Sequence, residues 1–355
     1  MDNIVDKLLD QPSVWQRLQD CGKPVVLYGM GDGADKVLAA FEKYGITADG
    51  VMASDDFVRG QSFHGFTVKK LSDFESEFGD FVIALCFASQ LPEVTAHIRS
   101  VAERHTMLVP SVPAFGGVLF DDAFLERYSS EIEDAYRLMA DEQSRLVYET
   151  ALRFYRTGEL ELTSAADTGK DEAFGKLLRL GGGEVYLDLG AYNGDTIGEF
   201  LHYSGGSYRR IIALEPNAKN FRKLRERCGD MENTELLQLG AYSSKTTLTF
   251  NNKAGRNSAV SDRGVPTPVD AVDNIVGAET VTYIKADVEG ADYEMLLGAK
   301  NTLKSAKPKL NISAYHRFED IFRLPLLINQ INPDYKIYLR HHPYIPMWDT
   351  NLYCV

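Results

Sequence analysis

The stretch that decides the fold is VYLDLGAYNGDT at residues 185–196, followed by IIALEPN at residues 211–217. Each begins with a short apolar run, which predicts a buried parallel strand. Glycines in the first turn let the backbone approach a ligand, and Glu215 at the end of the second strand can accept hydrogen bonds from two ribose hydroxyls. The two segments together predict a nucleoside site at the carboxyl ends of neighbouring strands.

The spacing of the glycines separates two kinds of nucleoside ligand. A dinucleotide turn requires a second glycine two positions after the first, so that backbone amides reach a pyrophosphate. Here Tyr192 takes that position after Gly190, and the next glycine is Gly194. The turn therefore suits a ligand without phosphate, such as S-adenosylmethionine, whose sulfonium and amino acid tail tolerate Asp188 and Asp195. The first interpretation is a methyl-transfer domain.

The composition bounds the class of protein and its partners. A chain of 355 residues exceeds the roughly 250–300 at which single cores stop growing, so we expect two domains. The longest apolar run, residues 81–88, is far shorter than the roughly 20 residues needed to cross a membrane. A net charge of -13 argues against a nucleic-acid partner. With no secretion signal and four scattered cysteines, we expect a cytoplasmic protein without a zinc site or disulfides.

The first third of the chain reads as a smaller Rossmann-like α/β domain, residues 1–124. A strand at 24–28, the glycine-rich turn GMGDGA at 29–34 and a helix at 36–44 open it, after two short helices within residues 1–20. Amphipathic helical spacing follows over residues 125–155. We expect residues 125–172 to be a helical connector and a possible homodimer surface. Further strands are expected at 46–52, 81–87 and 107–109, with a helix at 92–105.

Residues 173–355 are expected to form the methyltransferase domain. Its last two strands are separated by only a short loop containing proline, which is too short for a parallel crossover, so they should run antiparallel. A mostly parallel sheet with one reversed strand is the layout of class I methyltransferases. Buried runs predict its strands at 184–189, 210–215, 234–239, 281–287, 309–314, 335–340 and 351–355.

Four segments of this domain resemble the FkbM family of S-adenosylmethionine-dependent methyltransferases, over roughly residues 175–355. They are DLGAYNGDT at 188–196, ALEPN at 213–217, YIKADVEGADYEMLLGA at 283–299, and ISAYHRFEDI with the later YLRHH at 312–342. The resemblance implies methyl transfer to an oxygen of a small-molecule or sugar-like acceptor. It implies cofactor-binding roles for Asp188, Gly190, Ala191, Tyr192, Asn193, Gly194, Asp195, Thr196, Glu215 and Asn217.

Three residues are candidates for catalysis. His316 follows the strand at 309–314, and an unperturbed imidazole titrates near neutral pH, so it can accept the proton of a hydroxyl acceptor. Asp287 and Glu289, two residues apart at a strand end, can point the same way and position the acceptor. Two alternatives stay open: His316 can simply tie the strand to the following helix, or the three can hold a divalent cation, although our main prediction contains no metal.

Two rival functions and one gap remain at this stage. Gly29, Gly31 and Ala34, with Asp55 further on, fit a phosphate-binding turn formally, but Asp32 would repel a phosphate. The N-terminal domain is therefore either a nucleotide or nucleotide-sugar site or a ligandless sheet. The whole chain could instead be a binding protein without catalysis, or an NAD-dependent oxidoreductase. The identity of the methyl acceptor cannot be predicted from the sequence, because side chains of loops such as residues 251–268 determine which molecule binds.

Overall fold

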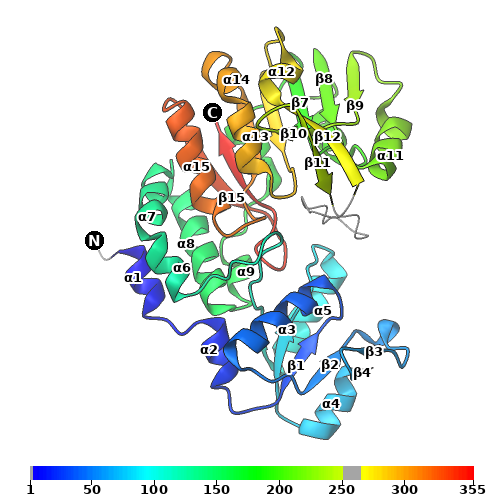
Figure 1. Cartoon of the computed structure of the whole chain (residues 1–355), viewed down its shortest axis with the longest axis vertical. Coiled ribbons are helices and arrows are strands. Elements are labelled where there is room, and N and C mark those ends of the chain that lie inside the picture. Colours follow the sequence, from blue (N-terminus) through cyan, green and yellow to red (C-terminus); the bar gives the residue numbers. More distant parts are fainter. Residues whose placement is uncertain (1–2, 251–264) are drawn as a thin grey trace.

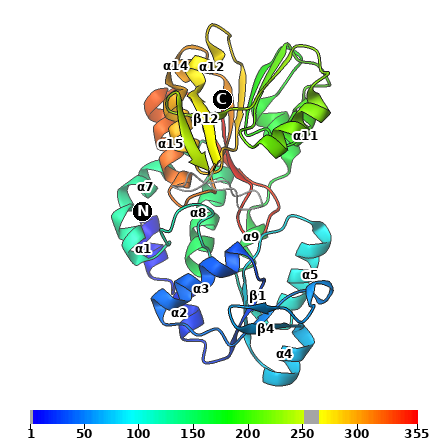
Figure 2. The same ribbon diagram turned by 45° about the vertical axis from the view of Figure 1, so that its right-hand side comes forward.

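Two mainly parallel sheets, one in each half of the chain, form the frame of the computed structural model (Figure 1). The structure describes residues 3–250 and 265–355, so most of the loop expected to select the acceptor, residues 251–264, lies outside the described residues. A layer of helices lies between the two sheets and beside the C-terminal one (Figures 1 and 2). Within the described ranges, no helix is both long and apolar enough to span a membrane.

The N-terminal sheet has six strands in the order β3-β4-β2-β1-β5-β6. The expected parallel strands are present, but the strand predicted at 46–52 is shorter, and the helix after the glycine-rich turn begins earlier. The hairpin of β3 and β4 was not predicted, because both strands are short and mostly half-exposed and so lack a buried run. The strands are β1 Val25–Tyr28, β2 Gly50–Met52, β3 Ser62–Phe63, β4 Phe66–Lys69, β5 Val82–Leu85 and β6 Thr106–Leu108, and the helices are α3 Asp32–Tyr44, α4 Leu71–Phe78 and α5 Pro92–Ala102.

The segment with continuous helical periodicity is three helices: α6 Asp122–Arg127, α7 Ser129–Leu138 and α8 Glu142–Thr157. The break before α8 has a local cause, since the Asp141 carboxylate accepts the Ser144 backbone N–H at 2.8 Å and so begins a new helix. Gly158, at φ +64, ends α8. A single pattern of apolar spacing therefore continues across helix boundaries that capping residues set.

The connector packs on its own chain rather than standing apart from it. Helix α8 contacts β15 (Ile337–His341), α7 contacts α15 (Asp320–Ile331), and the first helix, α1 (Ile4–Leu9), lies against α6, α7 and α8 (Figure 2). Most apolar side chains of α8 are buried there. One apolar core runs through α1, the connector and both sheets. The domain boundaries and a homodimer through this segment stay predictions.

The C-terminal sheet confirms the predicted class I layout. Its order is β15-β16-β14-β13-β7-β8-β9, and β16 alone runs antiparallel to its neighbours, between β14 and β15. The reason is the short connection from β15 to β16, which permits only a hairpin. The other strands are β7 Val185–Leu189, β8 Arg210–Leu214, β9 Thr234–Leu237, β13 Tyr283–Ala286, β14 Lys309–Ser313 and β16 Thr350–Cys354.

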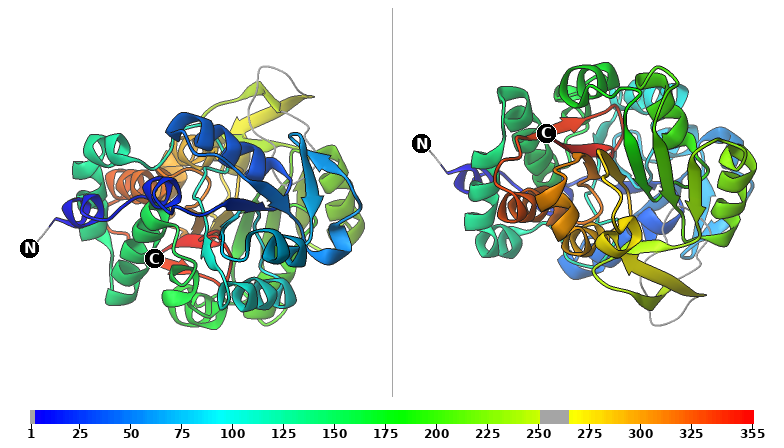
Figure 3. Two further views of the ribbon diagram at one scale, coloured as in Figure 1. Left: turned by 90° about the horizontal axis from the view of Figure 1, so that it is seen from below. Right: turned by 90° about the horizontal axis from the view of Figure 1, so that it is seen from above.

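Helices cover both faces of this sheet (Figure 3). Tyr186 of β7 packs toward α10 and α11 on one face, whereas Leu187 belongs to the core formed with α13, α14 and α15 on the other. A small sheet, β10-β12-β11, was not predicted. The elements not yet bounded are α2 Val14–Gln19, α9 Leu162–Ala165, the π-helix Glu172–Leu178, α10 Asp195–Tyr203, α11 Ala218–Cys228, α12 Val272–Val276, α13 Asp292–Gly298, α14 Lys300–Ser305, β10 Gly240–Tyr242, β11 Thr246–Phe250 and β12 Val265–Ala271.

Candidate active site

The turn between β7 and α10 is shaped by its two glycines. Gly190 has φ +84, and a Cβ there would lie 2.0 Å from the Asp287 carbonyl oxygen, so no larger residue fits. Gly194 also has φ +84, and its Cβ would lie 2.8 Å from the Cys228 sulfur. Tyr192, at the position where a dinucleotide turn has glycine, takes a left-handed φ of 47°. The backbone thus passes close to the end of β13, as a ligand-binding turn requires.

Glu215 joins this turn to the end of β8. Its carboxylate accepts the backbone N–H of Tyr192 at 3.0 Å and that of Asn217 at 2.8 Å. Only 6% of the residue is exposed, and burial raises the pKa of the carboxyl to about 7, although the two N–H donors oppose the rise. Each carboxylate oxygen keeps a second acceptor position, so a ribose can still bind here.

Asp188 lies beneath the turn and is fully buried. One carboxylate oxygen accepts the Thr196 hydroxyl at 2.5 Å, while Oδ1 has no hydrogen-bond partner in the described part of the chain and lies 3.6 Å from Nζ of Lys285. Burial raises the pKa of Asp188, and the Lys285 charge opposes this. Lys285 donates to the Gly190 carbonyl at 3.0 Å and so fixes the turn. The sequence analysis missed its role; a lysine within the buried strand β13 was the available signal.

Other residues predicted to bind the cofactor make hydrogen bonds with backbone groups of the protein in this structure. Asn193 accepts the backbone N–H of Asp195 at 3.1 Å. Asn217 caps α11 by accepting two backbone N–H groups, from Lys219 and Asn220. Ala191 is buried at the start of the turn, and its N–H donates to the Leu214 carbonyl at 2.9 Å. Direct contacts of these residues with a cofactor stay predictions.

The three predicted catalytic residues meet at the ends of β13 and β14. Nε2 of His316 lies 3.0 Å from Oδ1 of Asp287 and 3.8 Å from Oε2 of Glu289. Both Nε2 and Oδ1 are buried, and neither finds a well-aligned hydrogen bond among the described residues. Glu289 has a left-handed φ of 54°, which turns its side chain into this group. The arrangement places an imidazole nitrogen and a carboxylate oxygen, both able to exchange a proton, beside the glycine turn.

Two further carboxylates lie behind the His316 ring. Nδ1 of His316 and Oδ2 of Asp292 lie 2.8 Å apart, which orients the ring, and Asp320 accepts the Arg317 backbone N–H at 2.9 Å. Ligand atoms of Asp292, His316 and Asp320 lie within 4.8 Å of one another, the spacing of a possible metal site. Because the shortest of these contacts is a hydrogen bond, we interpret the trio as support for the ring.

The charges of this cluster determine its protonation. Burial opposes a charge on His316, yet the Asp292 and Asp287 carboxylates outweigh it and raise the pKa of the ring well above its usual value. Burial also opposes a charge on Asp287, but His316 and Lys285 lower its pKa. Burial, reinforced by neighbouring carboxylates, raises the pKa of Glu289 to about 8. At neutral pH His316 is therefore protonated and paired with an ionised Asp287.

A segment of the N-terminal half covers His316. The Phe115 ring lies 5.6 Å from the imidazole, edge to face, and the Phe115 N–H donates to the His316 carbonyl at 3.1 Å. A Cβ on Gly290 would lie 3.1 Å from the Phe115 ring, so Gly290 makes room for it. Sequence analysis could not find Phe115, because no local pattern links it to a strand end so distant along the chain.

The sheet order and the site at the strand ends define the class of the protein, a methyltransferase with the class I fold. Residues 188–344, in the C-terminal part of the chain, match the family model of the methyltransferase FkbM domain. The predicted resemblance is confirmed. No curated protein matches the chain.

Among solved structures, methyltransferase FkbM from Methylobacillus flagellatus KT is similar over 100% of this chain and 94% of its own, with a TM-score of 0.72 and 21% identity. The likeness in fold therefore includes the N-terminal half. Fibrillarin from Methanococcus jannaschii (TM-score 0.34, 15% identity, 50% of this chain and 68% of that one) is similar over only part of the chain. Aeropyrum pernix fibrillarin with bound S-adenosyl-L-methionine (0.33, 13%, 50% and 68%) is equally distant.

Proposed function

We propose that this protein is an S-adenosylmethionine-dependent O-methyltransferase that acts on a hydroxyl group of a small-molecule or sugar-like acceptor. One observation carries the proposal. Nε2 of His316 and Oδ1 of Asp287 are buried next to the glycine turn and lie 3.0 Å apart, and neither has a hydrogen bond of good geometry among the described residues. Proton-transferring groups beside a nucleoside site suit an acceptor that must lose a proton.

The residues around the turn fit the cofactor. Glu215 would accept hydrogen bonds from the ribose, and Oδ1 of Asp188, which has no hydrogen bond among the described residues and faces Lys285 at 3.6 Å, lies beneath the turn. Gly190 and Gly194 leave the space that a side chain would fill. When bound, S-adenosylmethionine supplies a methyl group on a positively charged sulfur.

The reaction needs position more than covalent chemistry from the protein. With the cofactor held by the turn and Glu215, the acceptor oxygen would take the methyl group while sulfur kept the bonding electrons, so the protein itself would have to supply only an acceptor for the hydroxyl proton. The hydroxyl proton would pass to the cluster, where Nε2 of His316 can accept it only in molecules whose ring has already lost its proton. Glu289, with a pKa near 8, is the second acceptor. Turnover should therefore increase with pH above neutrality.

Two measurements test the proposal. Calorimetric titration should show binding of S-adenosylhomocysteine and none of NAD; binding of NAD alone would contradict it. Cell extract incubated with the protein and methyl-labelled cofactor should then yield a labelled small molecule whose methyl group is on oxygen. Label on nitrogen, carbon or protein would refute the O-methyl assignment while leaving the cofactor assignment intact.

A further inference from the structure

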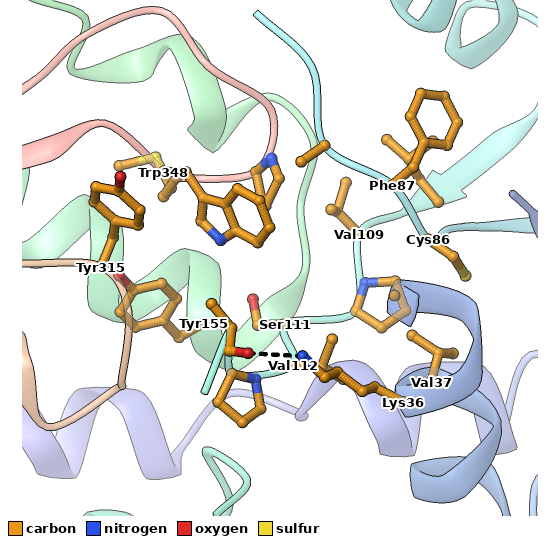
Figure 4. Close-up of a pocket in the computed structure, with 18 of the residues that line it drawn as sticks. Lys36, Val37, Cys86, Phe87, Val109, Ser111, Val112, Tyr155, Tyr315 and Trp348 are labelled. Carbon is orange, nitrogen blue, oxygen red and sulfur yellow. Dashed lines mark hydrogen bonds between the residues drawn. The ribbon is translucent and has the colours of Figure 1, made fainter. Parts of the chain in front are cut away.

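A cavity of about 250 Å³ lies between the two halves of the chain (Figure 4). A single water needs only about 10–15 Å³ of such space, so the cavity has room for a small organic molecule. Its walls come from both sheets: the turn after β1, the end of β5, the segment at 109–114, and the C-terminal residues Tyr315 and 346–348. The site described above does not account for this space.

The position of the cavity is the one where an α/β sheet binds ligands. In the N-terminal sheet β1 is flanked by β2 on one side and β5 on the other, so the strand order reverses between β1 and β5. Ligands bind at the carboxyl ends of the strands at such a point. Gly31 and Gly33 after β1 and Cys86 to Ala88 after β5 line the cavity.

The lining selects against a phosphate. Among the described residues that line the cavity, Lys36 is the one cation, and its Nζ is committed to Asp32 at 2.8 Å and to the Ala114 carbonyl at 2.7 Å (Figure 4). The other walls are mostly apolar or aromatic, including Trp348, Tyr155 and several prolines and valines. A nucleotide would place its charge without a counter-ion. A neutral, largely apolar molecule matches these walls.

One polar atom shows that the cavity is more than a packing defect. The Ser111 hydroxyl oxygen is buried, with the residue 7% exposed, and it has no hydrogen-bond partner among the described residues. Buried hydroxyls are normally paired, so this one requires an explanation. Ser111 belongs to the cavity wall, so a rotation of its hydroxyl toward the cavity would let a ligand there supply the missing partner.

Tyr315 connects the cavity to the catalytic cluster. Its ring lines the cavity and stacks with Trp348 at 6.3 Å between centroids, and its hydroxyl donates to Oδ2 of Asp287 at 3.4 Å. The neighbouring residue is His316. A molecule lodged against Tyr315 therefore lies one side chain away from the Asp287 carboxylate.

We infer that this cavity binds the methyl acceptor, and that the acceptor is a neutral, largely apolar hydroxyl compound whose far end hydrogen-bonds to Ser111. The inference rests on the proposed function and narrows its acceptor class. The N-terminal sheet then acts as the acceptor-selecting part of the enzyme, and it takes no nucleotide or nucleotide sugar.

Binding to the full chain tests the inference without a known substrate. The probes are 2-naphthol, a neutral two-ring phenol, and uridine diphosphate glucose, each titrated by calorimetry in the presence of S-adenosylhomocysteine. We expect 2-naphthol to bind and the nucleotide sugar not to bind. Because 2-naphthol has one hydroxyl, the contact with Ser111 is tested with 2,6-dihydroxynaphthalene, which has a second hydroxyl at its far end. Ser111→Ala should weaken this diol by about twofold to tenfold, as the loss of one neutral hydrogen bond would.

A filling variant and a matched control locate the site. Ala88 lines the cavity, so Ala88→Trp should weaken 2-naphthol by more than tenfold. Leu91→Trp adds the same ring to the same loop region at a residue that is 55% exposed, and it should leave binding unchanged. Thermal unfolding and the affinity for S-adenosylhomocysteine should be the same for all three variants as for the parent protein.

Each of the other outcomes would refute one part of the inference or the proposed function on which it rests. Binding of the nucleotide sugar that Ala88→Trp blocks would refute the neutral class, and 2-naphthol bound equally well by Ala88→Trp would refute the location. Binding of neither probe while S-adenosylhomocysteine binds would refute the inference and leave the proposed function standing. If the parent protein does not bind S-adenosylhomocysteine but binds 2-naphthol, and Ala88→Trp weakens that binding as expected, the proposed function is contradicted instead.

Discussion

Replacing Glu215 by Gln tests the cofactor site most directly, because it changes the charge and keeps the size. The Glu215 carboxylate accepts two backbone N–H groups, at 3.0 Å from Tyr192 and 2.8 Å from Asn217. A glutamine has only one acceptor oxygen, so its NH2 must face one of these donors or the ribose. Either choice removes a charge-assisted hydrogen bond from the bound state.

The expected loss follows from that count. One hydrogen bond to a charged group contributes about 1.5–3 kcal/mol, and about 1.4 kcal/mol changes affinity tenfold. Glu215→Gln should therefore weaken S-adenosylhomocysteine by roughly tenfold to a hundredfold. Glu215→Ala should cost more, because it also leaves the Tyr192 and Asn217 N–H groups without an acceptor at a nearly buried position.

Calorimetry at pH 8 measures both variants, and Glu226→Gln is the control. Glu226 lies on α11 with its side chain 69% exposed, so its replacement changes the net charge equally without touching the turn. An affinity within threefold of the parent for Glu215→Gln would refute the ribose assignment. An equal loss in Glu226→Gln would show a general charge effect instead.

The same site predicts a pH dependence. Burial raises the pKa of Glu215 to about 7 in the free protein, and a ribose prefers the ionised carboxylate. Affinity should thus be full above pH 7 and decrease as the pH falls below it, by at most about tenfold per pH unit. Asp188, whose pKa burial also raises, and Lys285 face the same region. If the affinity of Glu215→Gln for S-adenosylhomocysteine still changes with pH in the same way, the titrating group is Asp188 or Lys285 and not Glu215.

Three further replacements test other parts. His316→Asn should retain cofactor affinity and lose transfer of labelled methyl, because it removes the proton acceptor beside the turn; normal transfer would make His316 structural. Gly190→Ala should weaken the cofactor more than tenfold, since its Cβ would lie 2.0 Å from the Asp287 carbonyl oxygen; calorimetry measures this. Arg340→Met should lower the free energy of unfolding in urea by about 3 kcal/mol, the lower end for a broken buried ion pair, because its partners Asp141 and Glu172 are partly exposed.

For each of these three replacements the chain offers a matched control variant, in which the same kind of residue is changed away from the site and from buried ion pairs. His202 is exposed on α10, and Gly183 has open space where a Cβ would be added. Arg222, with its side chain 69% exposed on α11, offers the same loss of charge as Arg340 without a buried partner. His202→Asn, Gly183→Ala and Arg222→Met should leave activity, affinity and stability near those of the parent protein.

The sequence predicted the C-terminal sheet well because its strands, except the half-exposed edge strand β9, are buried runs between clear turns. Antiparallel β16 could be predicted from loop length alone. The two N-terminal edge strands could not, since β3 and β4 expose much of their surface and carry no apolar pattern. The three connector helices were merged for the opposite reason: their apolar periodicity continues while the caps that separate them are single residues, such as Asp141.

In the candidate site, too, the features set by neighbouring residues in the sequence could be predicted, whereas those set by residues distant in the sequence could not. Parallel topology places the ends of β7, β8, β13 and β14 at one edge, so Asp188, Glu215, Asp287 and His316 could be grouped from sequence. Their protonation could not, because it depends on burial and on Asp292 behind the ring. The predicted use of His316 as a base now requires that it first lose a proton, which its place after a strand did not indicate.

The two sheets direct their carboxyl ends toward one cavity, which gives the N-terminal half a role in the reaction. Gly31 follows β1, Cys86 follows β5 and Tyr315 follows β14, and all three line that space. Phe115 extends the contact to His316 itself. Under the proposed function and the inference drawn from the cavity, two α/β units that meet in this way divide the work: the C-terminal strands would hold the methyl donor, and the N-terminal strands would hold the molecule that receives the methyl group. Acceptor range can then change through the N-terminal turn without altering the residues that bind the cofactor.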